Sequence, residues 1–372
     1  MNSSFLKNFD WIHFAAMILL LGVSLLMIWS TSFGGPAGAK EHEYFYRQSL
    51  FIIVGFFCYL LVSRFDYRFL SNFSLWIFLG VCGFLVLTYL WGLETRGSTR
   101  WIDIGSFRFQ PSEFVKPALI LVLAAYINSH PIAKLKNLLV SVIIMAIPAA
   151  LIFKQPDLGS AVVIVFIWLS IVLAGGIKPL ILLLMAGVGA VAGPVAWLFL
   201  KDYQRQRLEM FLNPSSDPLG SGYNIIQALI AVGSGEVTGR GFGRGTQSHL
   251  NFLPEYHTDF IFATLAEELG FVGSTLLIVL FAILVFRTLK VADKSADGFG
   301  ALVAIGVGTM VIFQVLVNIG MNMGVLPVTG IPLPLVSYGG SSLISTMISL
   351  GLVQSIAANR KNESEGVLIK SI

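Results

Sequence analysis

Long apolar runs recur along the whole sequence, and they constrain the fold more than any other feature. A helix needs about 20 apolar residues to cross a bilayer. About ten candidate spans can be read, over residues 11–33, 48–62, 73–93, 115–127, 138–153, 158–173, 180–200, 271–286, 301–323 and 342–358. The chain is 56% hydrophobic and only 12% charged over 372 residues, which excludes an ordinary soluble protein. The sequence therefore predicts an all-α polytopic membrane protein, a single membrane domain over residues 1–372 with about ten transmembrane helices.

The first apolar run resembles a signal peptide only superficially. Ala37-Gly-Ala39 mimics a cleavage site, but the run before it is too long for a signal peptide and follows no strongly basic segment. We therefore expect it to be a membrane span. Cys58 and Cys82 lie in or beside spans, and their spacing fits neither a disulfide framework nor a zinc site.

The charge distribution indicates the orientation. With ten spans, both termini lie on the same side of the membrane. Each side then holds 12 of the 24 basic residues, but the terminus side holds only 6 of the 20 acids and the opposite side holds 14. Long loops cross a membrane largely regardless of charge. Because many opposite-side bases lie in a long loop or crowd together at Arg96, Arg100 and Arg108, we expect cytoplasmic termini and functional arginines outside. Arginines at lipid headgroups are the alternative.

A polar stretch over about residues 201–258 separates the seventh and eighth spans, and it predicts one long extracytoplasmic loop. Asp259 stands where this loop re-enters the membrane, with Glu255 and His257 beside it. Ionisable groups are costly to desolvate at such a position, so Asp259 is a candidate functional residue. The alternative is that Asp259 only caps the following helix.

The segment before residue 115 reads as a helix start. Pro111 suits a first helical turn, and Glu113 suits the positive end of the helix dipole. Lys116 follows three residues later on the same helix face. We expect this pair to line a polar cavity that binds substrate, although a buried ion pair that only orients helices is the alternative. Asp157, in a second Gln-Pro-acid start, is interpreted as a first-turn acid.

The long loop also carries arginines among glycines. Residues 239–245 (GRGFGRG) resemble a nucleotide loop only weakly, because no strand precedes them and no Gly-Lys-Ser/Thr follows. Arg240 and Arg244 could instead present guanidinium groups to a phosphate, with a flexible turn as the alternative. In the ninth span, Gln314, Asn318 and Asn322 recur every fourth residue, a pattern typical of polar contacts between helices.

Eight short segments together resemble the SEDS family of polytopic peptidoglycan glycosyltransferases. They occur in the family's order from about the third span to the end of the chain, at residues 97–105 (GSTRWIDIG), 109–116 (FQPSEFVK), 155–160 (QPDLGS), 239–245, 253–263 (LPEYHTDFIFA), 267–270 (EELG), 318–321 (NIGM) and 332–342 (PLPLVSYGGSS). The residues around 326–340 look like the elongation branch of the family, with the division branch second.

The resemblance implies a reaction. Lipid II is polymerised into glycan strands at the outer face of the bacterial cytoplasmic membrane, and undecaprenyl pyrophosphate leaves. The family's essential loop aspartate corresponds to Asp259, and its glutamate and lysine correspond to Glu113 and Lys116. The resemblance also implies as partners a class B penicillin-binding protein that cross-links the strands and other membrane proteins of the elongation machinery. No nucleic acid is expected to bind.

The residue types fit this chemistry independently. Glycosyl transfer with inversion needs a base at the acceptor hydroxyl, for which Asp259 is best placed, and positive charge at the leaving pyrophosphate. The candidate substrate-binding residues are His257, Glu113, Lys116, Arg100, Arg205, Arg207, Arg240 and Arg244. A divalent cation, Mg²⁺ or Mn²⁺, could share the pyrophosphate role, but no carboxylate cluster marks a site for it.

Two other functions fit parts of the pattern. A transporter that flips lipid II would also have intramembrane charges and short, interrupted spans, but the chemistry-bearing residues concentrate on one face, not at the midplane. A non-catalytic scaffold of the elongation machinery would not require Asp259 or Glu113. Polymerisation of lipid II by the purified protein would separate a polymerase from both.

Overall fold

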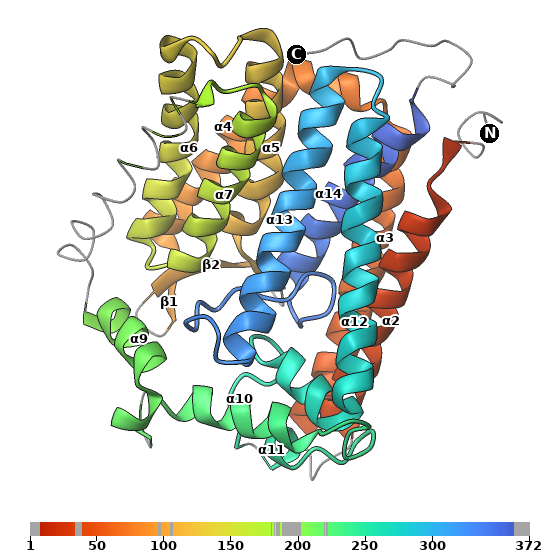
Figure 1. Ribbon diagram of the computed structural model, residues 1–372, viewed down its shortest axis with the longest axis vertical. Helices are drawn as coiled ribbons and strands as arrows, with labels where there is room; N and C mark the ends of the chain where they lie inside the picture. Colours follow the sequence, from red (N-terminus) through yellow and green to blue (C-terminus); the bar gives the residue numbers. More distant parts are fainter. Residues whose placement is uncertain are drawn as a thin grey trace.

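The protein is a bundle of long helices with a smaller extramembrane layer at one end (Figure 1). The computed structural model describes residues 8–33, 39–95, 98–104, 107–179, 181, 183, 187, 202–218, 220, 222–250 and 252–360. Within these ranges, eight helices are long and apolar enough to cross a membrane. They are α2 (Trp11–Phe33), α3 (Ala39–Arg64), α4 (Tyr67–Trp91), α5 (Pro111–Ser129), α6 (Leu135–Lys154), α12 (Ile261–Asp293), α13 (Gly298–Asn322) and α14 (Gly340–Ala358).

The predicted polytopic helical fold is confirmed, and most predicted spans match a helix. The predicted sixth span is α7 (Leu158–Ala174), a shorter apolar helix. The predicted seventh span, 180–200, lies almost wholly outside the described residues. The chain is therefore an integral membrane protein whose described part holds nine of the ten predicted spans.

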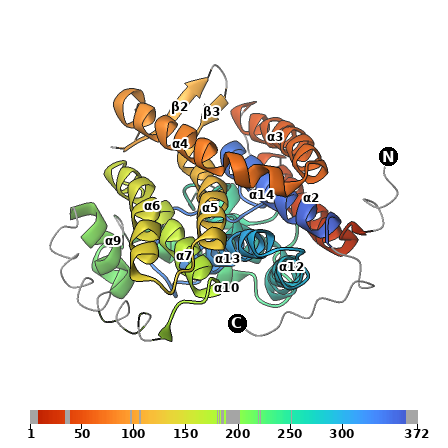
Figure 2. The same ribbon diagram turned by 90° about the horizontal axis from the view of Figure 1, so that it is seen from above.

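Three helices form the centre of the bundle. In its most apolar window, α14 has 89% of its residues buried, whereas α3 on the outside has only 17%. Helices α5 and α13 are also largely buried, and Figure 2 shows α5, α13 and α14 surrounded by the other spans. Outer helices expose apolar side chains such as Trp76 and Phe57, as expected where the surrounding solvent is lipid. The polar residues of the central helices are thus enclosed by protein.

Both described ends of the chain lie at one end of the bundle, hereafter the terminus end. The side-chain amide of Asn8 donates to the carbonyl oxygen of Ala358 at 3.4 Å. Figure 1 shows the same arrangement, with the start of α2 and the end of α14 toward the top and the shorter helices at the bottom. The bottom is hereafter the Asp259 end.

The Asp259 end contains secondary structure that the sequence analysis does not predict. Residues between α4 and α5 form an antiparallel three-stranded sheet of β1 (Leu93–Thr95), β2 (Ser98–Ile104) and β3 (Phe107–Phe109). The predicted long loop contains α9 (Asp202–Leu212), the 3₁₀ turn η1 (Pro214–Ser216), α10 (Tyr223–Ser234) and α11 (Thr246–His249). Aromatic and β-branched residues such as Thr99, Trp101 and Ile102 favour strands, which explains the sheet in a helical protein.

Helix α12 is broken near its start. Gly270 has φ 64° and ψ −160°, so the helix consists of a short segment, 261–269, and a long segment that follows. A Cβ atom at Gly270 would lie 2.3 Å from the amide nitrogen of Gly239, so only glycine permits this approach. Across the break, Phe271 donates its amide to Glu236 and Arg240 donates its amide to Glu267. Main-chain hydrogen bonds therefore hold the long loop on α12.

Candidate active site

Asp259 lies in a turn, residues 252–260, that ends where α12 begins; we refer to it as the Asp259 turn. The N-cap position of α12 is Phe260, so Asp259 does not occupy the cap position that the alternative interpretation gave it. The Asp259 side chain is half-buried. A Cβ atom on Gly330 would lie 3.7 Å from its Oδ2, which places the carboxylate over the α13–α14 connection, residues 323–339.

Two asparagines of α13 bind the main chain of the Asp259 turn. The side-chain amides of Asn318 and Asn322 both donate to the carbonyl oxygen of Asp259, at 3.1 and 3.0 Å. The Oδ1 atom of Asn322 also accepts from the amide of Ala263, at 3.2 Å, in the first turn of α12. The polar stripe that the sequence interprets as contact between helices therefore holds an irregular loop.

His257 lies among aromatic rings from two other segments. Its imidazole stacks on Tyr44 of α3, with ring centroids 4.4 Å apart, and meets the edge of Tyr338 at 5.5 Å. Burial lowers the pKa of His257, and the charge of Glu255 opposes this only in part. The ring is therefore neutral at physiological pH and is held beside the Asp259 turn.

Four of the helices that begin at this end of the bundle start near the α13–α14 connection. Helix α12 starts after the Asp259 turn, and α14 starts after Tyr338, whose amide donates to the carbonyl of His257 at 2.9 Å. Helix α5 joins them because the amide of Gln110 donates to Ser341 of α14. At the start of α7, Gly159 abuts Ile331. Helix N-termini carry positive partial charge, so this region favours an anionic ligand.

Glu113 and Lys116 form a buried ion pair in the first turns of α5. The Lys116 Nζ atom lies 2.8 Å from both carboxylate oxygens of Glu113, and the two side chains are 2% and 4% exposed. Ser345 of α14 donates to the carbonyl of Glu113 at 2.7 Å, which joins the pair to the centre of the bundle. Neither side chain faces lipid, and their predicted role in substrate binding remains a prediction.

Arg100 projects from β2 to the turn between α6 and α7. Its guanidinium donates to the carbonyl oxygens of Gln155, at 3.1 Å, and Pro156, and lies 4.0 Å from the carboxylate of Asp157. Asp157 is the N-cap of α7 and accepts from the amide of Ser160, so it lies one position before the first helical turn in which the sequence places it. Arg100 therefore attaches the small sheet to the start of α7.

Arg240 and Arg244 lie on the glycine-arginine loop, residues 239–245, and both are exposed. Arg240 also donates to the hydroxyl of Thr246 at 2.9 Å. Arg205 and Arg207 lie on α9, which Figure 1 shows beside the bundle and apart from α12. The structure thus distributes the predicted cations over several elements, with the exposed pair Arg240 and Arg244 on a loop attached to α12.

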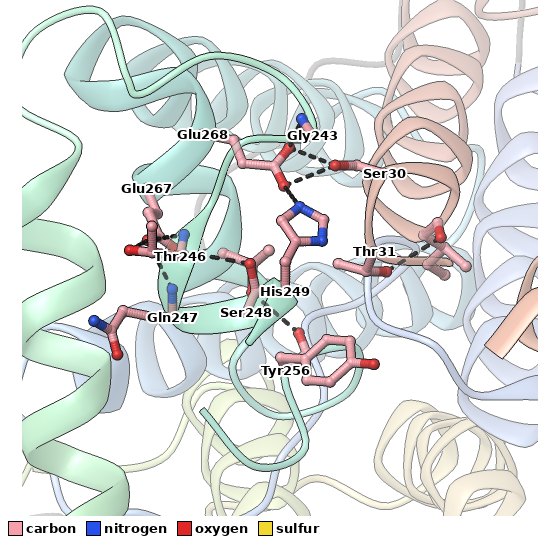
Figure 3. A network of polar contacts seen from close by, with 12 residues as sticks. Ser30, Thr31, Gly243, Thr246, Gln247, Ser248, His249, Tyr256, Glu267 and Glu268 are labelled. Atoms are coloured by element: carbon pink, nitrogen blue, oxygen red, sulfur yellow. Dashed lines mark hydrogen bonds and ion pairs between the residues drawn. The ribbon is translucent and has the colours of Figure 1, made fainter. Parts of the chain in front are cut away.

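Two consecutive carboxylates hold the loop that carries Arg240 and Arg244 (Figure 3). Glu267 Oε1 accepts from the amides of Thr246 and Gln247 at 2.7 and 2.9 Å. Glu268 Oε2 accepts from the amide of Gly243 at 3.2 Å. Both glutamates are fully buried, so these bonds compensate for the cost of removing two charges from water.

Glu268 also joins three segments of the chain. Its carboxylate oxygens lie 2.7 Å from the hydroxyl of Ser30 on α2, and Oε1 lies 3.0 Å from Nε2 of His249 on α11. Figure 3 shows the three side chains meeting between the helices. Local sequence motifs predict no role for Glu267, Glu268 or His249. Two adjacent acids inside an apolar segment were the signal that could have identified them.

The described residues do not offer a metal site of the usual kind. Within the ranges given above, no group of three or more His, Cys, Asp or Glu side chains could hold a metal ion. A divalent cation bound by protein side chains alone therefore does not fit this part of the chain.

Comparisons with known proteins agree with this arrangement. A family model described as "Cell cycle protein", for FtsW, RodA and SpoVE, matches residues 10–362. The peptidoglycan glycosyltransferase MrdB of Escherichia coli strain K12 is 41% identical over 353 residues, which cover 94% of each chain.

Two solved structures share the fold. One, described as "Structural coordination of polymerization and crosslinking by a peptidoglycan synthase complex", has a TM-score of 0.80 at 30% identity and covers 94% of this chain and 97% of that chain. The rod shape determining protein RodA of Thermus thermophilus has a TM-score of 0.71 at 28% identity and covers 95% and 98%. The family expected from the sequence segments is thereby confirmed, and the chain belongs to the SEDS family of FtsW, RodA and SpoVE proteins.

Proposed function

We propose that this chain is a peptidoglycan glycosyltransferase that polymerises lipid II during cell elongation. The Escherichia coli relative carries the name peptidoglycan glycosyltransferase, and the Thermus thermophilus neighbour is named as rod shape determining. Both similarities extend over nearly the whole chain, and the family model matches the segments around Asp259. We therefore assign this chain to the elongation branch of the family.

The observation that carries the mechanism is the position of Asp259. Its carboxylate lies over the α13–α14 connection, near which four helices begin. We assign Asp259 as the general base: it accepts the proton of the acceptor sugar hydroxyl while that oxygen attacks the anomeric carbon of the donor. The bond from the anomeric carbon to the lipid pyrophosphate breaks in the same step, so the pyrophosphate leaves and the configuration inverts. Proton transfer of this kind contributes about 10²–10⁴-fold to a rate.

The leaving pyrophosphate requires positive charge. Arg240 and Arg244 are exposed on a loop held by α12, the helix that begins after Asp259, and we propose that they contact the phosphates. Helix N-termini around the α13–α14 connection would add favourable partial charge. The buried Lys116, paired with Glu113, would act over a longer range.

Partners and location follow from the same assignment. We propose that the protein resides in the bacterial cytoplasmic membrane with both termini in the cytoplasm, so that Asp259 faces outward. A class B penicillin-binding protein is the proposed transpeptidase partner, supported by a structural neighbour that concerns coordinated polymerization and crosslinking. Other membrane proteins of the elongation machinery are further proposed partners. Mg²⁺ or Mn²⁺ carried by the pyrophosphate remains a proposal, tested by polymerisation after chelation and readdition.

Replacing Asp259 tests the base assignment. Purified Asp259→Asn in detergent should lose at least 10²-fold in lipid II polymerisation, because an amide cannot accept the proton. Its melting temperature should match the wild type, since Phe260 is the N-cap of α12. Near-wild-type turnover of Asp259→Asn would overturn the assignment. If the wild-type protein forms no glycan strands with the transpeptidase partner present, the transporter and scaffold functions take precedence.

A further inference from the structure

The Asp259 turn is held through its main chain at three consecutive residues. The carbonyl of His257 accepts from the amide of Tyr338 at 2.9 Å, and the carbonyl of Thr258 accepts from the hydroxyl of Ser337 at 2.6 Å. The carbonyl of Asp259 accepts from two side-chain amides, as described above. All these donors belong to α13 or to the connection that follows it.

Asn318 and Asn322 are both fully buried and one helical turn apart. Asn318 also donates to the carbonyl of Ile331 at 2.8 Å, so one side chain joins the Asp259 turn to the α13–α14 connection beside Gly330. Asn322 donates to the carbonyl of Asn318 at 2.8 Å, which fixes its own orientation. The two amides therefore determine where the Asp259 main chain lies relative to the connection under its carboxylate.

Asn322 has a second function at the start of α12. Its Oδ1 atom accepts the amide of Ala263, one of the first-turn N–H groups that lack a partner within the helix. An asparagine of another helix thus provides a hydrogen bond that usually comes from the N-cap side chain. The start of α12 is therefore secured by α13.

We propose that Asn318 and Asn322 are positioning residues for the glycosyl transfer, and that they act by holding the Asp259 main chain and the start of α12 in a fixed relation to the α13–α14 connection. This inference rests on the proposed role of Asp259. A misplacement of about 1 Å can reduce a rate by about 10²-fold, so loss of these donors lowers turnover without removing the base.

Three substitutions separate positioning from general packing. Asn318→Leu removes the donor to Asp259 and keeps the number and branching of the side-chain heavy atoms. Asn322→Asp removes the donor but keeps an acceptor for Ala263. Gln314→Leu is the matched control: it is buried one turn earlier on the same face, and its side-chain amide makes no hydrogen bond within the described residues.

The expected result is a fall in kcat of about 10–100-fold for Asn318→Leu and Asn322→Asp, with the KM for lipid II changed less than threefold. Gln314→Leu should keep kcat within about threefold of the wild type. Melting temperatures in detergent and the stoichiometry of lipid II binding identify any loss that comes from unfolding. Equal kcat values for all three variants would overturn the inference.

A second measurement tests whether the asparagines act through Asp259. In an Asp259→Glu background the carboxylate is already displaced by one methylene, so Asn318→Leu should lower kcat by a much smaller factor than in the wild type. An unchanged factor would indicate an independent structural role. If Asp259→Asn is active, the base assignment fails; if it is inactive while the asparagine variants match Gln314→Leu, only the positioning inference fails.

Discussion

The two ends of the bundle use polar residues differently. At the terminus end, two carboxylates bind side chains of other elements: Arg287 of α12 makes three hydrogen bonds to the carboxylate of Asp10, which precedes α2. Tyr67 of α4 and Arg68 both donate to Asp297, the N-cap of α13. These contacts join helix ends directly. The terminus end is therefore fixed by pairs that connect one regular element to another.

At the Asp259 end, side chains mainly bind main chain. Asn318 holds the Asp259 turn, Arg100 holds the turn before α7, and Glu267 holds the loop after residue 245. Main-chain groups of an irregular loop must find partners when they are buried. Buried polar side chains thus allow irregular backbone to be rigid there, which suits a site that must position a reacting group.

The largest expected effect concerns the buried Glu113–Lys116 ion pair at the Asp259 end. Lys116→Met should destabilise the protein by about 3–5 kcal/mol, because it leaves the carboxylate of Glu113 buried without its cation. Thermal unfolding in detergent measures the loss, and the double variant Glu113→Gln/Lys116→Met should recover most of it. If Lys116→Met is as stable as the wild type, water reaches the carboxylate of Glu113 and the prediction is wrong.

Loosening the glycine-arginine loop should have a smaller and local effect. Glu267→Ala leaves the amides of Thr246 and Gln247 without their acceptor, at a cost of about 1–3 kcal/mol. Tryptic cleavage after Arg240 and Arg244 should then increase roughly 5- to 150-fold, with little change in global melting. The control is Glu209→Ala at an exposed residue of α9, and trypsin should cleave this variant at the same rate as the wild type. Equal cleavage of both variants would contradict the role of Glu267.

Alanine variants of two glycines in the α13–α14 connection distinguish the effect of backbone strain from an effect on the geometry around Asp259. Gly330 and Gly324 have φ values of 73° and 66°, so alanine at either position costs about 1–2 kcal/mol. Only Gly330 lies beside the Asp259 carboxylate, whereas a Cβ atom on Gly324 would face Leu229. Gly330→Ala should therefore lower kcat on the order of tenfold more than Gly324→Ala. Matching kcat values would place the reacting groups elsewhere.

The smallest effect concerns His257 and pH. Because burial lowers the pKa of His257, the folded protein binds fewer protons than the unfolded chain just below pH 6.5. The stability of the wild type should therefore fall as the pH drops from 7 toward 5. The fall should be smaller in His257→Phe, which keeps the aromatic contact with Tyr44 but has no group that binds a proton. The difference in melting temperature between wild type and variant at pH 7 and pH 5 isolates this residue. A pH-independent difference would indicate that His257 contributes only packing.

The apolar runs determined the class of fold because the requirement to span a bilayer leaves little choice of structure. Local motifs predicted the helix start at Pro111, an acid at the start of the helix after Asp157, and the shared helix face of Glu113 and Lys116, all of which depend on residues close in sequence. Chemistry within one or two turns of a helix is decided locally.

The tertiary structure decided what the polar residues contact. Asn322 and Asp259 are 63 residues apart, and Ser30 and Glu268 are 238 residues apart, so no local pattern could pair them. The break of α12 at Gly270 likewise depends on the approach of the loop around Gly239. Side-chain periodicity determines the helix face on which a residue lies. The element packed against that face then decides whether an asparagine amide joins two helices or binds the turn that carries Asp259.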